Sequence, residues 1–124
     1  MMRILPGLVS IALALPALSW GHAYLVKSMP AGRAVVFKGP ARVQLWFNER
    51  LEPRFSSLSV SNSDGKRVDL GDVRVAAEDL KQLSVKVGAL PAGLYFIKFR
   101  VLSVDGHVVE DQFPFTIRDS RSGP

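Results

Sequence analysis

Short runs in which apolar and polar residues alternate constrain this chain more than any other feature of its sequence. Residues 43–47 place Val43, Leu45 and Phe47 on one phase. The same pattern recurs in residues 83–87, 95–101 and 109–117. Because successive side chains of a strand point to opposite faces, a period of two gives a strand one face for a core and one for water. These runs predict strands, and nothing after residue 21 has the pattern of a long amphipathic helix.

Turn residues separate the alternating runs. Pro-Ala-Gly occurs at residues 30–32 and 91–93, and Asp-Gly at residues 64–65 lies between two runs and suits a tight hairpin. Residues 76–81 are expected to form one helical turn at most. Six or seven short strands at this spacing predict an all-β fold, an antiparallel β-sandwich. Asp111 falls on the apolar phase of its run, so we expect a bulge or an edge position that turns it outward.

Residues 1–21 have the three-part pattern of a secretory signal peptide. Arg3 supplies a positive start, residues 4–18 are apolar apart from one serine, and Ser19-Trp20-Gly21 has small residues at its first and third positions. Cleavage after Gly21 would make His22 the first residue of the exported protein. The apolar run is shorter than the ~20 residues that span a bilayer, which leaves a retained membrane anchor as the weaker alternative.

Three segments are therefore expected: a signal peptide at 1–21, one sandwich domain at 22–118 and a flexible polar tail at 119–124. The chain has no cysteine, so the sandwich must hold without disulfides, and a cysteine-type zinc site or a blue-copper centre is excluded. The formal net charge is +5. Its basic residues are scattered and the chain is exported, so we expect no nucleic-acid partner.

The two histidines are the candidate metal ligands. After cleavage, His22 would offer its free α-amine and its ring to the same ion, because the amine, with a pKa of ~8, can lose its proton to a metal near neutral pH. Asp105 and His107 are two residues apart, which on an extended segment places them on one face, and Gly106 between them leaves room for close approach. Three nitrogens and one carboxylate oxygen form the tetragonal set that Cu(II) prefers, which predicts one Cu(II) ion.

Simpler interpretations of the same residues stay open. Asp105-Gly106 is also a common hairpin turn, and an N-terminal histidine can be an accident of cleavage. Glu49 follows a strong strand and could approach the site from a loop, or it is a solvated loop charge. The argument for a metal site is that the only two histidines fall at a new N-terminus and beside an acidic residue.

Four stretches resemble the CopC family of periplasmic copper-resistance proteins. They are the segments His-Ala-Tyr-Leu-Val-Lys-Ser-Met-Pro at 22–30, Val-Gln-Leu-Trp-Phe-Asn-Glu at 43–49, Leu-Pro-Ala-Gly-Leu-Tyr at 90–95 and Arg-Val-Leu-Ser-Val-Asp-Gly-His at 100–107. The resemblance implies a cupredoxin-like, immunoglobulin-like Greek-key sandwich in the periplasm. It implies one Cu(II) ion on His22, Asp105 and His107, with Glu49 beside that site. The methionine-rich Cu(I) loop of some relatives is absent here.

The resemblance implies a non-enzymatic, monomeric copper carrier or buffer in copper homeostasis. Its implied partner is a CopD-type inner-membrane copper transporter. Two other function classes compete with this hypothesis. A copper-brace oxidase similar to a polysaccharide monooxygenase also begins with a histidine, but Asp105 as a further ligand would leave less room for oxygen. A metal-free interaction sandwich would depend on neither histidine.

Overall fold

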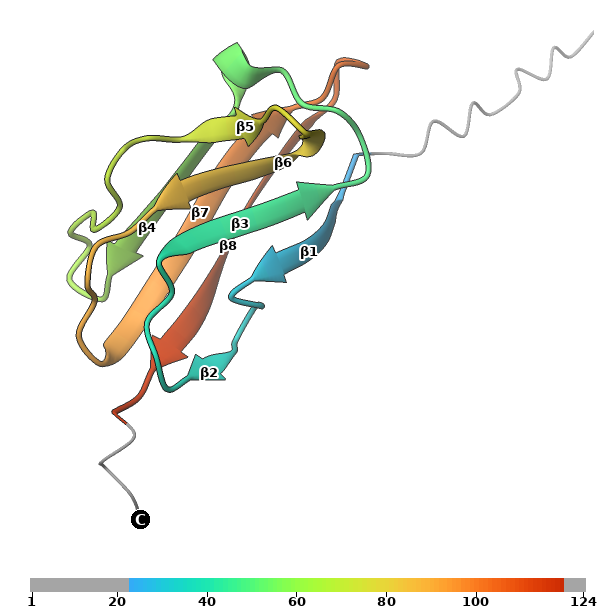
Figure 1. The fold of residues 1–124 in the computed structure, drawn as a ribbon. Helices are drawn as coiled ribbons and strands as arrows, with labels where there is room; N and C mark the ends of the chain where they lie inside the picture. The colour runs from blue at the N-terminus through green and yellow to red at the C-terminus, as the bar shows by residue number, and fades with distance from the viewer. Residues whose placement is uncertain (1–22, 120–124) are drawn as a thin grey trace, which may run out of the picture.

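The computed structural model describes residues 23–119, which form two packed β-sheets (Figure 1). The strands are β1 (Leu25–Met29), β2 (Val35–Val36), β3 (Arg42–Phe47), β4 (Ser57–Asn62), β5 (Arg74–Ala76), β6 (Asp79–Lys86), β7 (Gly93–Leu102) and β8 (Val108–Ile117), with a 3₁₀ turn η1 (Pro53–Phe55) before β4. One sheet has the order β1-β3-β6-β5 and the other the order β2-β8-β7-β4. The predicted all-β sandwich is confirmed.

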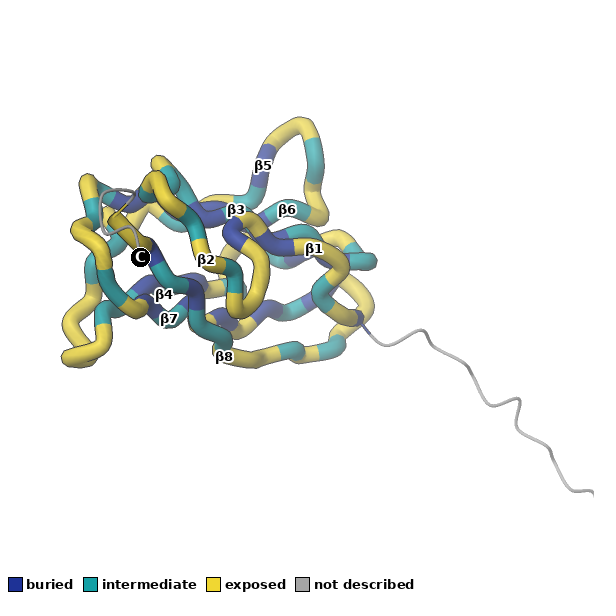
Figure 2. The backbone as a smooth tube through the Cα atoms, turned by 90° about the horizontal axis from the view of Figure 1, so that it is seen from below, coloured by how far each residue is buried: buried dark blue, intermediate teal, exposed yellow. Residues whose placement is uncertain are grey.

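The core lies between the two sheets and follows the predicted alternation. The side chains of Val43, Leu45 and Phe47 are at most 2% exposed, while their neighbours along β3 are half-buried. Figure 2 shows buried residues along the strands and mostly exposed residues in the loops between them. Phe47 and Phe99, from opposite sheets, form an edge-to-face ring pair. Tyr95 and Phe115, from neighbouring strands of one sheet, are stacked. Burial of alternate residues is thus what selects these strands.

The strand pairing differs from the sequence prediction in two places. Residues 76–81 form no helical turn, because Ala76 and Asp79 pair across the tight β5–β6 hairpin. The pairing is antiparallel throughout except between β2 and β8, where Val35 and Val36 run parallel to Thr116 and Ile117. Both differences arise in very short strands, whose few residues carry no readable period.

Asp111 is exposed, and its place in the sheet explains why. The register between β7 and β8 runs without interruption from Gly93–Ile117 to Leu102–Val108, so this pair contains no bulge. Among the described strands, the other neighbour of β8 is β2, and it pairs only with the last two residues of β8. At Asp111, β8 is therefore an edge, which lets a charged side chain reach water. Of the two expected explanations, the edge is confirmed and the bulge is wrong.

The Asp-Gly turn after β4 is confirmed. Gly65 has a φ of 84°, a backbone conformation that glycine adopts most readily, and its N–H donates to the carbonyl of Asn62. The chain then returns beside β4 through a single Ser61–Arg67 bridge. Within residues 23–119, no helix is long and apolar enough to cross a membrane. The predicted signal peptide, its cleavage site and most of the predicted tail lie outside the described residues.

Candidate metal centre

The connection between β7 and β8 carries two of the three predicted ligands. It is a tight turn, not the extended segment that the sequence argument assumed. The Ser103 N–H donates to the carbonyl of His107, and the Gly106 N–H donates to the carbonyl of Ser103, both at 2.9 Å. Gly106 has a φ of 94°, and a Cβ added to it would meet no atom within 4 Å. Glycine is therefore favoured here by the backbone conformation and not, as expected, by the need for space.

This turn nevertheless brings the predicted ligands together. The Nδ1 atom of His107 lies 3.0 Å from Oδ1 of Asp105, and both side chains are partly exposed, at 36% and 26%. Two donors bound to one ion at ~2.0–2.1 Å would stand about 2.9 Å apart in neighbouring corners of a square and about 3.3 Å apart in a tetrahedron. The observed separation fits two donors of one metal ion, although the Nδ1 atom of His107 is itself hidden from solvent.

Ser103 orients this pair, and the sequence analysis assigned it no role. Its side chain is 1% exposed; the hydroxyl donates to Oδ1 of Asp105 and accepts from the His107 N–H at 3.2 Å. The hydrogen bond from Ser103 lowers the pKa of Asp105; partial burial opposes this, and contacts with His107 lower the pKa further. The signal that could have identified Ser103 is a serine two residues before an aspartate at a turn, where hydroxyls commonly bond locally.

The first strand begins at the same end of the sandwich as this turn (Figure 1). Ala23 is buried, and Tyr24 pairs with Asn48, which follows β3 directly. The Tyr24 N–H donates to the side-chain Oδ1 of Asn48 at 2.6 Å, and the Asn48 N–H donates to the carbonyl of Tyr24 at 3.1 Å. The chain therefore has a fixed starting point two residues after His22. His22 itself lies outside the described residues.

The loop after β3 continues from Asn48 to the ligand turn. The Val104 N–H donates to the carbonyl of Arg50, and the Glu52 N–H donates to the carbonyl of Leu102, at 2.9 and 2.8 Å. Glu49 lies in this loop and is half-buried. Within residues 23–119, no three His, Asp or Glu side chains lie close enough to hold a metal ion. The structure thus brings Asp105 and His107 together but does not add Glu49 to them.

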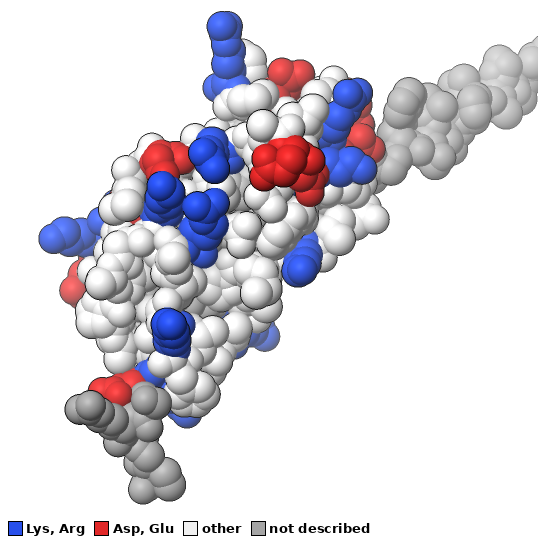
Figure 3. Space-filling view, viewed as in Figure 1, with Lys and Arg blue, Asp and Glu red and all other residues white. Residues whose placement is uncertain are grey.

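The surroundings of the pair are acidic although the whole chain is basic. Loops at this end carry the carboxylates of Glu49, Glu52, Glu78 and Asp105, and β6 begins with Asp79; the basic residues of the same segments are fewer, namely Arg50, Arg54 and Lys81. Figure 3 shows acidic side chains gathered near the point where residue 23 enters, with basic side chains interspersed. This arrangement favours the approach of a cation over that of an anion at close range.

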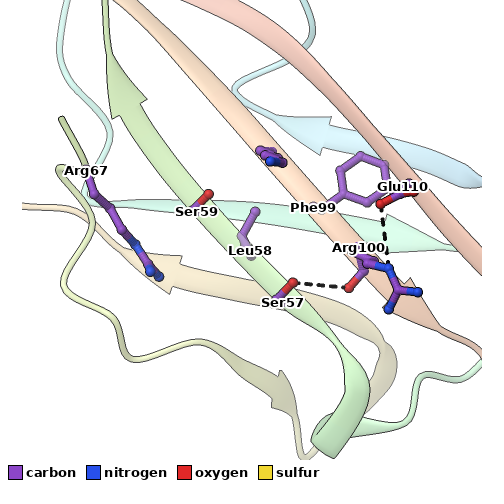
Figure 4. Close-up of a pocket in the computed structure, with 8 residues that line it drawn as sticks. Ser57, Leu58, Ser59, Arg67, Phe99, Arg100 and Glu110 are labelled. Atoms are coloured by element: carbon purple, nitrogen blue, oxygen red, sulfur yellow. Dashed lines mark hydrogen bonds and ion pairs between the residues drawn. The ribbon is translucent and has the colours of Figure 1, made fainter. Parts of the chain in front are cut away.

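A shallow groove of about 350 Å³ lies on the outer face of β4, β7 and β8 and is shown in Figure 4. It contains neither Asp105 nor His107. Two of its cations have carboxylate partners: Arg67 Nε lies 2.8 Å from Oδ2 of Asp69, and Arg100 Nε lies 3.6 Å from Oε2 of Glu110. The exposed Arg100–Glu110 pair is ordinary for a solvated sheet face, and Arg67 is already held by the buried Asp69 carboxylate, so the groove gives no support to a separate binding function.

The fold and this turn define a class: a small β-sandwich with a carboxylate and an imidazole paired at the end where the first strand begins. Residues 25–118 match the family model of the CopC domain, so the chain belongs to the CopC domain family. It is 36% identical over 110 residues to the copper transport protein CutJ of Bacillus subtilis. That match covers 88% of this chain and 20% of CutJ, so the chain spans one fifth of the length of that relative.

Solved structures agree with the family assignment. The crystal structure of CopC from Methylosinus trichosporium OB3b aligns with a TM-score of 0.74 and 36% identity, covering 80% of this chain and 96% of that one. PcoC, a methionine-rich copper resistance protein from Escherichia coli, aligns with a TM-score of 0.69 and 28% identity, covering 78% and 99%. The predicted membership is confirmed: this is a chain of the copper resistance and copper transport family.

Proposed function

We propose that this protein is an exported, periplasmic Cu(II)-binding protein whose site is completed when cleavage after Gly21 frees the amine of His22. The observation that carries the proposal is the Asp105–His107 pair, 3.0 Å apart at the end where the described chain begins. Ala23, which is covalently joined to His22, is buried at that end of the sandwich, which supports a position of the new N-terminus on the same side as the pair. His22 would give an amine and an imidazole nitrogen, and Asp105 and His107 one donor each.

The proposed stoichiometry is one Cu(II) ion per chain. Nitrogen and carboxylate donors without thiolate suit Cu(II) better than Cu(I). The methionines of the chain are Met1, Met2 and Met29, so the proposal includes no methionine site. Glu49 is proposed as a neighbour of the site that adds negative charge without binding the ion.

The proposed role is that of a monomeric carrier or buffer without catalytic turnover. It would pass copper to or from a CopD-type membrane protein. In support, a relative that is 36% identical is named a copper transport protein, and this domain matches one fifth of it. An oxidase would predict ascorbate-driven peroxide production well above that of free copper, whereas the carrier predicts suppression of that reaction.

The test is intact mass and electron paramagnetic resonance of the exported protein with one equivalent of Cu(II). We expect a mass that begins at His22, one bound ion and a tetragonal signal with nitrogen coupling. The matched variant His22→Ala keeps the terminal amine but removes the imidazole half of the proposed chelate. A mature chain that begins at another residue, or equal Cu(II) affinity in the two proteins, would contradict the proposal.

A further inference from the structure

The loop that follows β3 contacts both parts of the proposed copper site. At its start, Asn48 pairs with Tyr24, two residues after His22. At its end, Arg50 and Glu52 bond to Val104 and Leu102, which flank the ligand turn. Leu51 is 3% exposed and forms a bridge with Ser103. Residues 48–52 thus connect two segments that lie near opposite ends of the described chain.

The bond between Asn48 and Tyr24 is unusual for a strand pair. Leu25 is opposite Phe47, so Tyr24 is opposite Asn48, and an ordinary antiparallel pair here would exchange two backbone hydrogen bonds. One of these exists, from the Asn48 N–H to the Tyr24 carbonyl. In the other, the side-chain Oδ1 of Asn48 replaces the backbone carbonyl as acceptor. The backbone of residue 48 is thereby released to turn into the loop while Tyr24 stays paired.

The pairing immediately after this point is weak. The register of β1 against β3 shifts between Leu25 and Lys27, which leaves Val26 without an opposite residue. β1 is also an edge strand in the order β1-β3-β6-β5. A bulged edge strand frays easily, so the two bonds to Asn48, together with the burial of Ala23, hold the backbone at Tyr24. Consecutive Cα atoms are ~3.8 Å apart, so His22 can move only within ~7.6 Å of that fixed point.

We infer that Asn48 is a positioning residue for copper: through Tyr24 it holds the N-terminal residue in reach of the Asp105–His107 turn. The inference rests on the proposed function, because it assumes that His22 binds the ion. Asn48 is not proposed to touch the metal. Its side chain restricts where the amine and the ring of His22 can be, which lowers the entropy lost when the ion binds.

The experiment compares Asn48→Ala with wild type in the processed, full exported protein. Amide hydrogen exchange at Tyr24 without metal measures how firmly Asn48 holds the backbone of Tyr24. A Cu(II) competition titration measures the copper affinity, and electron paramagnetic resonance reports the geometry of the bound ion. We expect faster exchange at Tyr24, an affinity about 10-fold lower, the low end of the range for residues that orient ligands, and a broadened or heterogeneous copper signal. Asn48→Asp keeps the Oδ1 acceptor and should restore a single signal.

Asn62→Ala is the matched control. Asn62 also accepts backbone N–H bonds through Oδ1, from Asp64 and Lys66, and lies at the opposite end of β4 from the site. It should leave the copper signal and affinity unchanged. If the alanine variant of Asn48 does not fold, Asn48→Gln keeps an amide but displaces its oxygen, and the same changes are expected.

The outcomes separate the two proposals. A wild-type protein that binds no Cu(II) overturns the proposed function and this inference together. Normal Cu(II) binding in wild type, with an unchanged signal and affinity in Asn48→Ala although Tyr24 exchange has accelerated, overturns the inference alone. Unchanged exchange at Tyr24 also overturns it, because the position of the Tyr24 backbone would then not depend on the side chain of Asn48.

Discussion

Asp69 and Asp105 are both carboxylates with lowered pKa values, but they lie in opposite kinds of surroundings. The Asp69 side chain is 0% exposed, and both oxygens accept hydrogen bonds: Oδ2 from the Val60 N–H and Arg67 Nε, and Oδ1 from the Gly71 N–H. The Asp105 side chain is 26% exposed, and its hydrogen bonds with Ser103 and His107 all involve Oδ1. The first carboxylate is enclosed by donors, and the second presents an edge to solvent.

The difference shows what each carboxylate can do. Burial raises the pKa of Asp69, but the hydrogen bonds from Arg67, Val60 and Gly71 and the charge of Arg67 outweigh it and lower the pKa. Asp69 thereby fixes the loop between β4 and β5 and has no room for a metal. The hydrogen bond from Ser103 is the largest cause of the lowered pKa of Asp105, and its carboxylate is partly exposed to solvent. A lowered pKa alone therefore does not distinguish the structural carboxylate of Asp69 from the proposed ligand Asp105, and their exposures differ.

The largest effect we expect is on stability, from Asp69→Ala. It would leave the N–H groups of Val60, Gly71 and Arg67 without their acceptor, and loss of hydrogen bonds to a buried charge costs about 3 kcal/mol. Urea unfolding of the metal-free protein measures this. Copper affinity of the folded fraction should not change. The control is Asp111→Ala, which removes an exposed carboxylate at the edge of β8 and should change stability by less than about 0.5 kcal/mol. A destabilisation no larger than that of the control would show that the hydrogen bonds of Asp69 do not stabilise the fold.

The opposite pattern is expected for Asp105→Ala and for His107→Ala. Each removes one proposed ligand, and we expect a loss of Cu(II) affinity of about 100-fold or more, above the range for residues that only orient ligands. Because both side chains are partly exposed, the unfolding free energy of the metal-free protein should change by about 1 kcal/mol or less. Competition titration against a copper chelator measures the affinity. Asp111→Ala again serves as control, and an affinity loss equal to that of the control would remove these residues from the site.

Much of the fold could be predicted from periodicity because burial on one face of a strand leaves a direct trace in the sequence. Val43, Leu45 and Phe47 show it most clearly. The very short β2 and β5 could not be found this way, since two or three residues carry no period. The parallel pairing of β2 with β8 depends on contacts between distant segments, which no local pattern records.

The proximity of Asp105 and His107 was predicted from the sequence, but for a partly wrong reason. Asp105 and His107 are close because a turn with Gly106 at positive φ folds one toward the other, not because an extended strand points both to one side. The hydrogen bonds of Asn48 and Ser103 were missed because they reach the backbone of Tyr24, 24 positions away, and the side chain of Asp105, two positions away. Such bonds are set by three-dimensional placement, and a single sequence shows only the polar side chain that could make them.

A smaller loss of copper affinity is expected from Ser103→Ala, which sharpens the comparison between enclosed and open carboxylates. The variant removes the hydroxyl that orients Asp105 and keeps both ligands, so an affinity loss of about 10-fold is expected. Ser84→Ala, at a buried serine of β6, is the matched control and should leave the affinity unchanged. Competition titration and the nitrogen coupling in electron paramagnetic resonance report the change. Equal affinities in the two variants would mean that Asp105 needs no orienting hydroxyl.

The smallest expected effect is the acid dependence of stability that Asp69 contributes. Its pKa in the folded protein lies below its ordinary value of 3.8, so its contribution is fully present above that pH and is lost as the pH falls through the folded pKa. In the Asp69→Asn variant, no carboxylate titrates at this position. The metal-free variant should therefore be less stable than wild type at neutral pH, and the gap between the two should narrow below about pH 4. Urea unfolding from about pH 7 to about pH 2.5 measures the gap. A gap that stays constant over this range would show that ionisation of Asp69 is not what holds the β4–β5 loop, and the contrast with Asp105 would then rest on exposure alone.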